Sequence, residues 1–394
     1  MLNQIIHTPE GVRDIYGNEL LEKKYIKEKL NNIFHLRGYN PIETPSFEYL
    51  DMYYNEKDLT DTKDMFKFFD NNGNILSLRP DFTPAVCRCA AKYFSDSPLP
   101  LRLCYEGNTF INKSEHQGKL KETTQMGVEL ICKDSYADLD AEMVCLSIEA
   151  LKSLNLEDFQ VVIGEVSYFR SICKSIDFID NEFETFKEYV SLKNYFGARE
   201  LLENKNVDKS IIDALLGVSD IKNIEELREV KANTNNTDAL KAIERLEQLY
   251  EIIQSMGFEK YVSFDLALLN KFNYYSGVLF RVYTHGVGDA IVKGGRYDEL
   301  LPKFGTNNSA IGLVFLIEEI QSALNMQKLQ PTIENSGTMV VYNSSNRIKA
   351  LNYLNELREK NTVCFGIYKE DDKDESWYKE YSKSNGYNEP VFFI

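Results

Sequence analysis

The chain has 394 residues, 43% of them hydrophobic, so it is long enough for two or three domains with substantial cores. Its formal net charge of −16 and the lack of a basic stripe argue against a nucleic-acid partner, because phosphate neutralisation supplies most of the affinity of polyanion binders. With no apolar run at the N-terminus typical of a signal peptide, no uncharged membrane-length stretch and seven scattered cysteines, we expect a cytoplasmic protein.

The N-terminal third alternates helix and strand patterns. Residues 18–37 have an apolar stripe at helical spacing, and the helix is expected to end near Gly38. Arg102–Tyr105 and Thr124–Ile131 show the alternation and β-rich composition of antiparallel strands. Residues 137–154 return to helical spacing. This pattern predicts an α+β domain built on an antiparallel sheet.

Residues 166–257 are predicted to form a mostly helical insert. In its last helix, residues 235–238 supply capping side chains, and a buried stripe follows at helical spacing. Gly257 can end that helix in the left-handed conformation. Beyond it we expect strands at Tyr261–Leu268 and Val278–Tyr283, and a helix over Ala310–Leu324 that packs on the sheet.

A polar, turn-rich segment at about 325–337 predicts a domain boundary. The first domain would then span residues 1–325, and a small α/β C-terminal domain would span 338–394. In that tail we expect a strand, a helix, a second strand, an acidic loop at 370–375 and a final apolar run.

The cysteines carry no clear metal pattern. Cys87-Arg-Cys89 could form half of a metal site, but no second Cys or His pair lies nearby in the sequence. We therefore expect buried, unreactive thiols, and no metal.

Five segments, taken in order, resemble the signatures of histidyl-tRNA synthetases. They are Thr8–Asp14, Gly38–Pro45 with the following Phe47-Glu48 (class II motif 1), Leu78–Pro84, Arg102–Leu130 (motif 2 and the next strand), and the Tyr274-Tyr275 pair followed by Lys293–Asp298. The resemblance covers residues 8–320. It implies a class II aminoacyl-tRNA synthetase-like fold, an antiparallel sheet flanked by helices.

The resemblance also implies a histidine-binding site. Asp81 and Thr83 would hold the α-ammonium group, and Gln125 can bridge ammonium and carboxylate with its mixed donor and acceptor amide. Glu129 shares a strand face with Gln125, because residues i, i+2 and i+4 of a strand point the same way. Glu129 would accept from one imidazole nitrogen, while Tyr274 or Tyr275 addresses the other.

Around this site, the resemblance makes Gly294, Gly295 and Arg296 supporting residues. A glycine pair permits close backbone approach. Arg296 is expected to brace the site through Asp298 or an acidic neighbour.

The chain departs from an active synthetase at the positions that bind ATP and the aminoacyl carboxylate. By resemblance, the motif 2 arginine is replaced by Ile111, the motif 3 arginine by Glu319, and the histidine-specific arginine by Asn270. Arginine serves there because its planar fork binds phosphate bidentately and stays charged. We expect no catalytic residues and no cofactor. Lys113 and Lys271 are candidate replacements for the carboxylate clamp, or simply solvated side chains.

Across its whole length, the chain resembles the family of ATP phosphoribosyltransferase regulatory subunits, which are paralogues of histidyl-tRNA synthetase. Membership implies a non-catalytic chain that self-dimerises through the motif 1 region. It also implies assembly with a short-form catalytic subunit into a hetero-octamer, with L-histidine as allosteric effector.

Two alternatives remain from the sequence. One is a divergent histidyl-tRNA synthetase with relocated cationic residues. The other is an amino-acid-sensing module that serves another partner, since a fold and a site do not name a partner.

Overall fold

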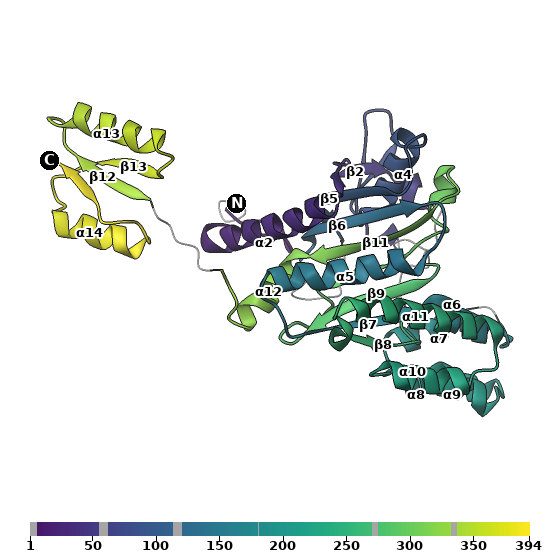
Figure 1. Cartoon of the computed structure of the whole chain (residues 1–394). Coiled ribbons are helices and arrows are strands. Elements are labelled where there is room, and N and C mark those ends of the chain that lie inside the picture. The colour runs from purple at the N-terminus through teal and green to yellow at the C-terminus, as the bar shows by residue number, and fades with distance from the viewer. Residues whose placement is uncertain (1–5, 55–61, 113–119, 180, 270–274, 332–336) are drawn as a thin grey trace. The chain divides into compact units, whose positions relative to one another are not determined.

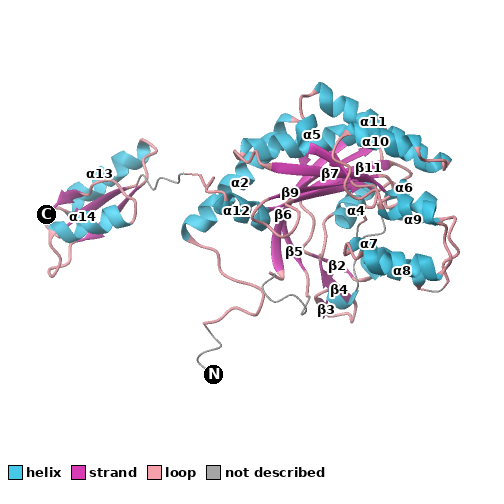
Figure 2. Ribbon diagram, turned by 90° about the horizontal axis from the view of Figure 1, so that it is seen from below, coloured by secondary structure: helices cyan, strands magenta, loops and turns pink. Residues whose placement is uncertain are grey.

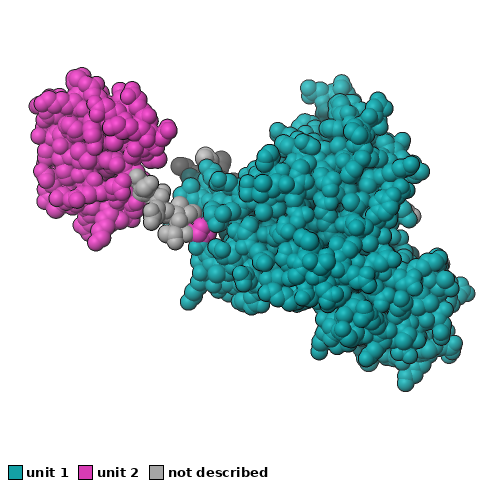
Figure 3. Space-filling model, viewed as in Figure 1, with its two compact units in different colours: residues 1–330 teal, residues 331–394 magenta. Residues whose placement is uncertain are grey.

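The computed structural model describes residues 6–54, 62–112, 120–179, 181–269, 275–331 and 337–394. The chain divides into two compact units, Met1–Gln330 and Pro331–Ile394, coloured separately in Figure 3. The division falls inside the polar segment at 325–337. Within the described ranges, no helix combines the length and apolar character that a membrane crossing requires.

The first unit is built on an eight-stranded sheet (Figure 1). Neighbouring strands are antiparallel except at the two edges, where β1 pairs with β5 and β7 with β8 in parallel. This confirms the predicted α+β class with a mainly antiparallel sheet. In spatial order the strands are β1 (Asn40–Pro41), β5 (Leu101–Phe110), β6 (Glu122–Cys132), β11 (Ser309–Leu316), β10 (Val292–Arg296), β9 (Val278–Thr284), β7 (Phe159–Glu165) and β8 (Val262–Phe264).

One face of this sheet is covered by helices that share its main hydrophobic core; Figure 2 shows α5 and α11 on that side. The alternate β6 residues Met126, Val128 and Leu130 point into this core. Gln125, Gly127 and Glu129 therefore face the opposite side of the sheet. The covering helices are α2 (Gly17–Leu36), α5 (Ala137–Ser153), α11 (Thr237–Ser255) and α12 (Ile317–Met326).

The predicted helices at 18–37 and 137–154 are confirmed as α2 and α5. Ile26, Leu30 and Phe34 form the buried stripe of α2. The helix ends as expected, because Gly38 has a positive φ of +76° that a larger residue would adopt only with strain.

The opposite face of the sheet carries a second, smaller core. A three-stranded antiparallel sheet and α4 lie on this side (Figure 2). Its elements are β2 (Phe47–Tyr49), β4 (Ile75–Leu78), β3 (Lys67–Phe69), α3 (Asp51–Tyr54), α4 (Thr83–Tyr93) and the 3-10 turns η1 (Thr62–Asp64) and η3 (Leu301–Phe304).

The helical insert is confirmed. Asn236 caps α11 by accepting from the backbone N–H groups of Asp238 and Ala239, and Gly257 follows that helix with φ +72°. The insert packs at the β7–β8 end of the sheet. Its helices are α6 (Val166–Cys173), α7 (Glu182–Ser191), α8 (Tyr195–Asn204), α9 (Lys209–Leu216), α10 (Ile224–Ala232) and α11, followed by η2 (Glu259–Tyr261).

Two sequence predictions in this unit are wrong in extent. The helix expected over Ala310–Leu324 is the strand β11 followed by the helix α12. Both faces of β11 are buried, so its residues form a continuous apolar run, which periodicity alone does not distinguish from a buried helix. The strand expected over Tyr261–Leu268 covers only Val262–Phe264, after which the chain turns at Asp265.

The second unit is a parallel three-stranded sheet in the order β13-β12-β14. A helix packs on each face: Tyr378 of α14 lies against Met339 and Val341, and Leu354 of α13 lies against Val340. The helix α14 follows the acidic loop, is capped by Asp374, and was not predicted. The elements are β12 (Thr338–Tyr342), α13 (Arg347–Glu359), β13 (Cys364–Tyr368), α14 (Glu375–Ser384) and β14 (Val391–Phe393).

All seven cysteines are free thiols. Five are buried as expected, whereas Cys89 and Cys364 are partly exposed. Among the residues that the structure describes, no three His, Cys, Asp or Glu side chains gather in a way that could hold a metal ion.

Candidate functional site

The centre of the candidate site is the face of β6 that points away from the helical layer. Gln125, Gly127 and Glu129 occupy this face. Glu129 lies opposite Leu103 of β5 on one side and Gly312 of β11 on the other. The sequence predicts that Gln125 and Glu129 share a strand face, and the strand register confirms that placement.

Glu129 is almost completely buried, with 1% of its surface exposed. Three hydroxyl groups donate to its carboxylate: Thr83 Oγ1 to Oε1 at 3.1 Å, Tyr105 OH to Oε1 at 3.4 Å, and Tyr297 OH to Oε2 at 2.5 Å. These donors satisfy the carboxylate within the chain, so its burial alone does not require a ligand.

Burial raises the pKa of the Glu129 carboxyl from its ordinary value of 4.5 to about 8. The Tyr297 hydrogen bond opposes this rise, and the negative charge of Asp81 adds to it. Glu129 is therefore mostly protonated at neutral pH in the ligand-free chain. A protonated carboxyl can donate one hydrogen bond and accept others, which suits a ligand that carries both kinds of group.

Glycines on the same face make room for the large side chains of the site. A Cβ atom on Gly312 would lie 1.6 Å from Glu129 Oε2, and one on Gly127 would lie 2.3 Å from the Tyr105 hydroxyl. At Gly295 a Cβ would come within 2.6 Å of the Tyr275 ring. The side chain of Tyr275 thus lies directly on the backbone of β10.

The loop before α4 brings Asp81 and Thr83 to this face. Arg79 holds the loop in place: its guanidinium donates to the carbonyl oxygens of Asn108 and Thr44, both at 2.8 Å, and stacks 3.9 Å from the ring centroid of Phe82. Asp81 Oδ1 accepts from the N–H of Phe82 at 2.8 Å. Thr83 was expected to meet an ammonium group, and in the ligand-free chain its hydroxyl is used by Glu129.

Gln125 provides the clearest sign of a missing partner. Its side-chain oxygen Oε1 is buried and has no hydrogen-bond partner among the described residues. Leaving a buried polar atom unsatisfied typically costs about 1–3 kcal/mol. Native structures rarely contain such atoms without a reason, and a ligand donor is one such reason.

The Tyr275–Ser276 segment is tied to the end of β10. The N–H of Ser276 donates to the carbonyl oxygen of Arg296 at 2.8 Å, and its hydroxyl contacts the carboxylate of Asp298 at 3.2 Å. Tyr274, Asn270, Lys113 and Lys271 lie outside the described residues.

Arg296 makes the expected contact with Asp298, at 3.1 Å, and a stronger one with Asp140 of α5. Two of its nitrogens donate to Asp140 Oδ1, at 2.9 and 2.5 Å. The other oxygen of Asp140 accepts two hydrogen bonds from Arg245 of the insert. This network links the end of β10 to α5 and to α11 of the insert.

The supporting residues of β10 thus point to different faces. Gly295 faces the site, whereas Gly294 faces the helical core, where a Cβ would lie 2.3 Å from the Phe280 ring.

Two of the three positions at which the resemblance places a synthetase arginine are described. The N–H of Ile111 donates to the carbonyl oxygen of Lys121 at 2.9 Å. Glu319 lies in the first turn of α12. Its neighbour Glu318 accepts from Lys23 at 2.7 Å and from the N–H of Thr124, next to Gln125, at 2.8 Å.

Sequence reasoning did not identify several residues of the site. Tyr105 and Tyr297 donate to Glu129 across 24 and 168 residues of sequence, and no local pattern marks such pairs. The sequence predicts a helix at Gly312, so the pairing of Gly312 with Glu129 across neighbouring strands was not predicted. Strand alternation could have identified Tyr105, because Tyr105 lies on the same face of β5 as Leu103, the residue opposite Glu129.

The arrangement provides hydrogen-bonding groups and aromatic walls. A carboxyl group with three hydroxyl donors and an unsatisfied amide oxygen share one strand face, and the side chains around them pack on glycines of β6, β10 and β11. These groups can bind and orient a small polar molecule that offers several donors and acceptors.

Comparison with known proteins gives consistent relatives. A sequence model of the family described as histidyl-tRNA synthetase matches residues 11–320. The ATP phosphoribosyltransferase regulatory subunit of Acetivibrio thermocellus is 36% identical over 356 residues, which cover 90% of this chain and 85% of that protein. The regulatory subunit of Caldanaerobacter subterraneus is 33% identical, with 91% of this chain and 93% of that protein covered.

Solved structures agree. A crystal structure described as an ATP phosphoribosyltransferase regulatory subunit/histidyl-tRNA synthetase from Bacillus halodurans C has a TM-score of 0.86 at 29% identity, covering 99% of this chain and 98% of that chain. The histidyl-tRNA synthetase of a Nostoc species has a TM-score of 0.80 at 17% identity, covering 97% of this chain and 90% of that one. At that identity the likeness shows a shared fold alone.

Proposed function

The chain belongs to the family of ATP phosphoribosyltransferase regulatory subunits, which shares the histidyl-tRNA synthetase fold, and from this premise we propose its function. It acts as a non-catalytic subunit that a short-form ATP phosphoribosyltransferase catalytic subunit needs for activity and for feedback inhibition by histidine. The observation that carries this proposal is the 36% identity to a regulatory subunit over 90% of the chain.

The proposed effector site is the face of β6 around Glu129, together with Asp81, Thr83, Gln125, Tyr275 and Tyr274. Histidine offers an ammonium donor, a carboxylate acceptor and an imidazole with two nitrogens. The ammonium group would donate to Gln125 Oε1 and Asp81, and the imidazole would meet Glu129. Support comes from the unpartnered Gln125 oxygen and from the carboxyl of Glu129 on the same face.

We propose that the chain does not activate histidine with ATP. Adenylyl transfer depends on positioned positive charge, and one such electrostatic donor is typically worth about 2.7–4 kcal/mol of transition-state stabilisation. The three matching positions carry Ile111, Asn270 and Glu319, none of them basic. The family resemblance, and not a contact in the structure, identifies these positions.

Self-association is proposed through the small sheet that follows motif 1. Three large aromatic side chains on one face of this sheet are exposed, the most exposed being Tyr49 at 58%. A patch of this kind on a protein surface commonly marks an interaction site. The three are Phe47, Tyr49 and Phe68, whereas the strand register places the exposed Phe69 and Ile75 on the other face. A dimer formed there, within a hetero-octamer in the cytoplasm, fits the family resemblance.

Reconstitution tests the proposed role. The catalytic subunit from the same organism is assayed for phosphoribosyl transfer to ATP, alone and with this chain. We expect the rate to rise at least tenfold on addition, while histidine-dependent exchange of pyrophosphate into ATP by this chain stays at background. Exchange above background would support the divergent synthetase, and an unchanged transferase rate would indicate a different partner.

A further inference from the structure

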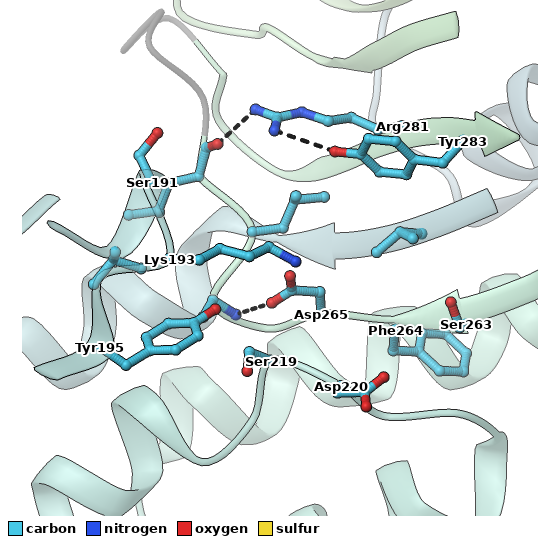
Figure 4. A pocket seen from close by; sticks show the side chains of 15 residues that line it. Ser191, Lys193, Tyr195, Ser219, Asp220, Ser263, Phe264, Asp265, Arg281 and Tyr283 are labelled. Atoms are coloured by element: carbon cyan, nitrogen blue, oxygen red, sulfur yellow. Dashed lines mark hydrogen bonds between the residues drawn. The ribbon is translucent and has the colours of Figure 1, made fainter. Parts of the chain in front are cut away.

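A second site candidate lies far from Glu129, where the helical insert meets the β7–β8 end of the sheet. A pocket of about 290 Å³ opens there (Figure 4). Its walls come from three places: strands β7 to β9, the turn between α7 and α8, and the turn between α9 and α10. Two turns of the insert that are separate in the sequence therefore line the same pocket as the sheet.

Four charged side chains line this pocket, two of each sign. Lys193 and Arg281 are basic, and Asp220 and Asp265 are acidic. In Figure 4 the Lys193 side chain extends towards Asp265, yet among the described residues none of the four forms a salt bridge. Because these opposite charges line the pocket without pairing with each other, water or a ligand with complementary charges can interact with them.

Asp265 forms the buried acidic wall, with 4% of its surface exposed. Its Oδ1 accepts from the N–H of Ala267 at 2.9 Å, and within the described ranges its other oxygen has no hydrogen bond. Burial raises the pKa of this carboxyl to about 6, so it is mostly ionised at neutral pH. This oxygen is accessible from the pocket, so a donor group of a ligand there could reach it.

Arg281 forms the basic wall. Its guanidinium donates to the carbonyl oxygen of Leu269 at 2.7 Å and contacts the Tyr283 hydroxyl at 3.5 Å. These contacts fix the orientation of the side chain and leave its charge without a carboxylate in the described part of the chain. Arginine held in this way can bind a carboxylate.

We propose that this pocket binds a small zwitterion, a free amino acid, with its carboxylate at Arg281 and Lys193 and its ammonium at Asp265 and Asp220. A simple anion would meet two carboxylates, and a simple cation would meet two basic groups. Only a ligand with both charges matches the lining. The volume accommodates a molecule of that size and lies near the lower end of ligand-site volumes.

Such a ligand would connect the insert to the sheet. Lys193 and Asp220 lie on turns of the insert, whereas Arg281 lies on β9 and Asp265 directly follows β8. An amino acid that contacts all four would hold the insert against the sheet. This role is independent of the function proposed above.

The test is a binding screen on the full chain. Each of the proteinogenic L-amino acids is added at millimolar concentration, and the melting temperature is recorded for wild type and for Glu129→Gln. The proposal expects at least one amino acid to stabilise both proteins. No stabilisation by any of them would overturn it, as would stabilisation lost in Glu129→Gln, which would place the ligand at the other site.

Titration calorimetry with the amino acid found then locates the pocket. Asp265→Asn keeps the acceptor for Ala267 and removes the charge, and Arg281→Gln removes the opposite charge. Each should weaken binding at least tenfold. Lys193→Gln and Asp220→Asn, at exposed rim positions, provide variants that fold even if the buried ones do not, and each should weaken binding measurably.

Two analogues of the same amino acid separate the charges. The acid that lacks the amino group and the amine that lacks the carboxylate should both bind at least tenfold more weakly. An acid that binds as well as the amino acid would show a plain anion site and overturn the proposal. Affinity unchanged in all four variants would do the same.

Discussion

At the scale of single residues, Glu129 and Gln125 differ in the hydrogen-bond donors that the chain provides for them. Glu129 has three hydroxyl donors within the chain, whereas Gln125 Oε1 has none among the described residues. The Glu129 carboxyl therefore stabilises the fold, in addition to its proposed role in the site. The amide oxygen is the group that a ligand would satisfy.

The raised pKa of Glu129 predicts a pH-dependent stability. The folded chain keeps this carboxyl protonated up to about pH 8, whereas the unfolded chain ionises it near 4.5. The unfolded state thus binds fewer protons in this window, so the contribution is fully present below pH 4.5 and is lost as pH rises towards 8. Relative to Glu129→Gln, wild type should lose on the order of 2 kcal/mol of unfolding free energy between about pH 6 and pH 8.

Urea unfolding at several pH values measures this difference. Glu129→Gln is the matched control because its neutral amide resembles the protonated carboxyl. Parallel pH profiles for the two proteins would show that Glu129 is ionised in the folded chain.

Gln125→Met separates stability from ligand binding. The substitution keeps the side-chain length and removes a buried amide oxygen that has no partner among the described residues, so the unfolding free energy should rise by about 1–3 kcal/mol. Histidine should nevertheless bind at least about tenfold more weakly, because its ammonium loses an acceptor. Titration calorimetry and thermal unfolding measure the two effects. Equal affinity in both proteins would exclude Gln125 from the site.

The sequence predicted the strand residues of this site but not the residues packed around them. Gln125 and Glu129 follow from period-two alternation, which is a local property. Tyr105, Tyr297 and Arg79 reach the site through the tertiary fold. No spacing in the sequence brings Tyr297 to Glu129.

At the scale of elements, β11 determines whether the site can form. It pairs with β6 over eight residues and places Gly312 beside Glu129. The apolar run of β11 predicts a helix, because both faces of the strand are buried and its sequence does not alternate between apolar and polar residues. Amphipathic elements such as α2 and α11 were predicted closely, since each has one buried and one exposed side.

Gly312→Ala tests this close packing. The new Cβ would meet Glu129 Oε2 at 1.6 Å and the carbonyl oxygen of Val128 at 2.8 Å, so β11 or Glu129 must move. We expect a loss of about 3 kcal/mol of unfolding free energy and a loss of histidine binding. Gly288→Ala is the control, because a Cβ there meets nothing within 4 Å. Similar stability of the two variants in chemical denaturation would contradict the described packing.

At the scale of the whole molecule, the chain consists of two units with separate cores. The polar segment at 325–337 predicted a domain boundary, and the structure divides the chain at Gln330, within that segment. The helix α14 was not predicted because Trp377, Tyr378 and Tyr381 are interspersed with charged residues, which gave no clear apolar stripe. Partners and stoichiometry lie outside what one chain specifies, since surface composition does not identify what binds it.

The exposed aromatic patch on the small sheet predicts the oligomeric state. Tyr49→Asp places a charge in that patch, beside Phe47 and Phe68, which should weaken a dimer formed there by at least about tenfold, because an unpaired charge is costly to bury. Phe196→Asp is the control, since Phe196 is 82% exposed and lies on the insert. Sedimentation velocity of the two variants measures the effect, and dimers of equal stability would place the interface elsewhere.

In the proposed function, histidine acts through this chain on a catalytic partner. The most direct test is the histidine inhibition curve of phosphoribosyl transfer by the reconstituted complex, with wild type and with Gln125→Met. We expect full activation of the partner by both proteins, and inhibition that needs at least about tenfold more histidine with the variant. Identical inhibition curves would contradict it, because histidine would then act without the site on β6.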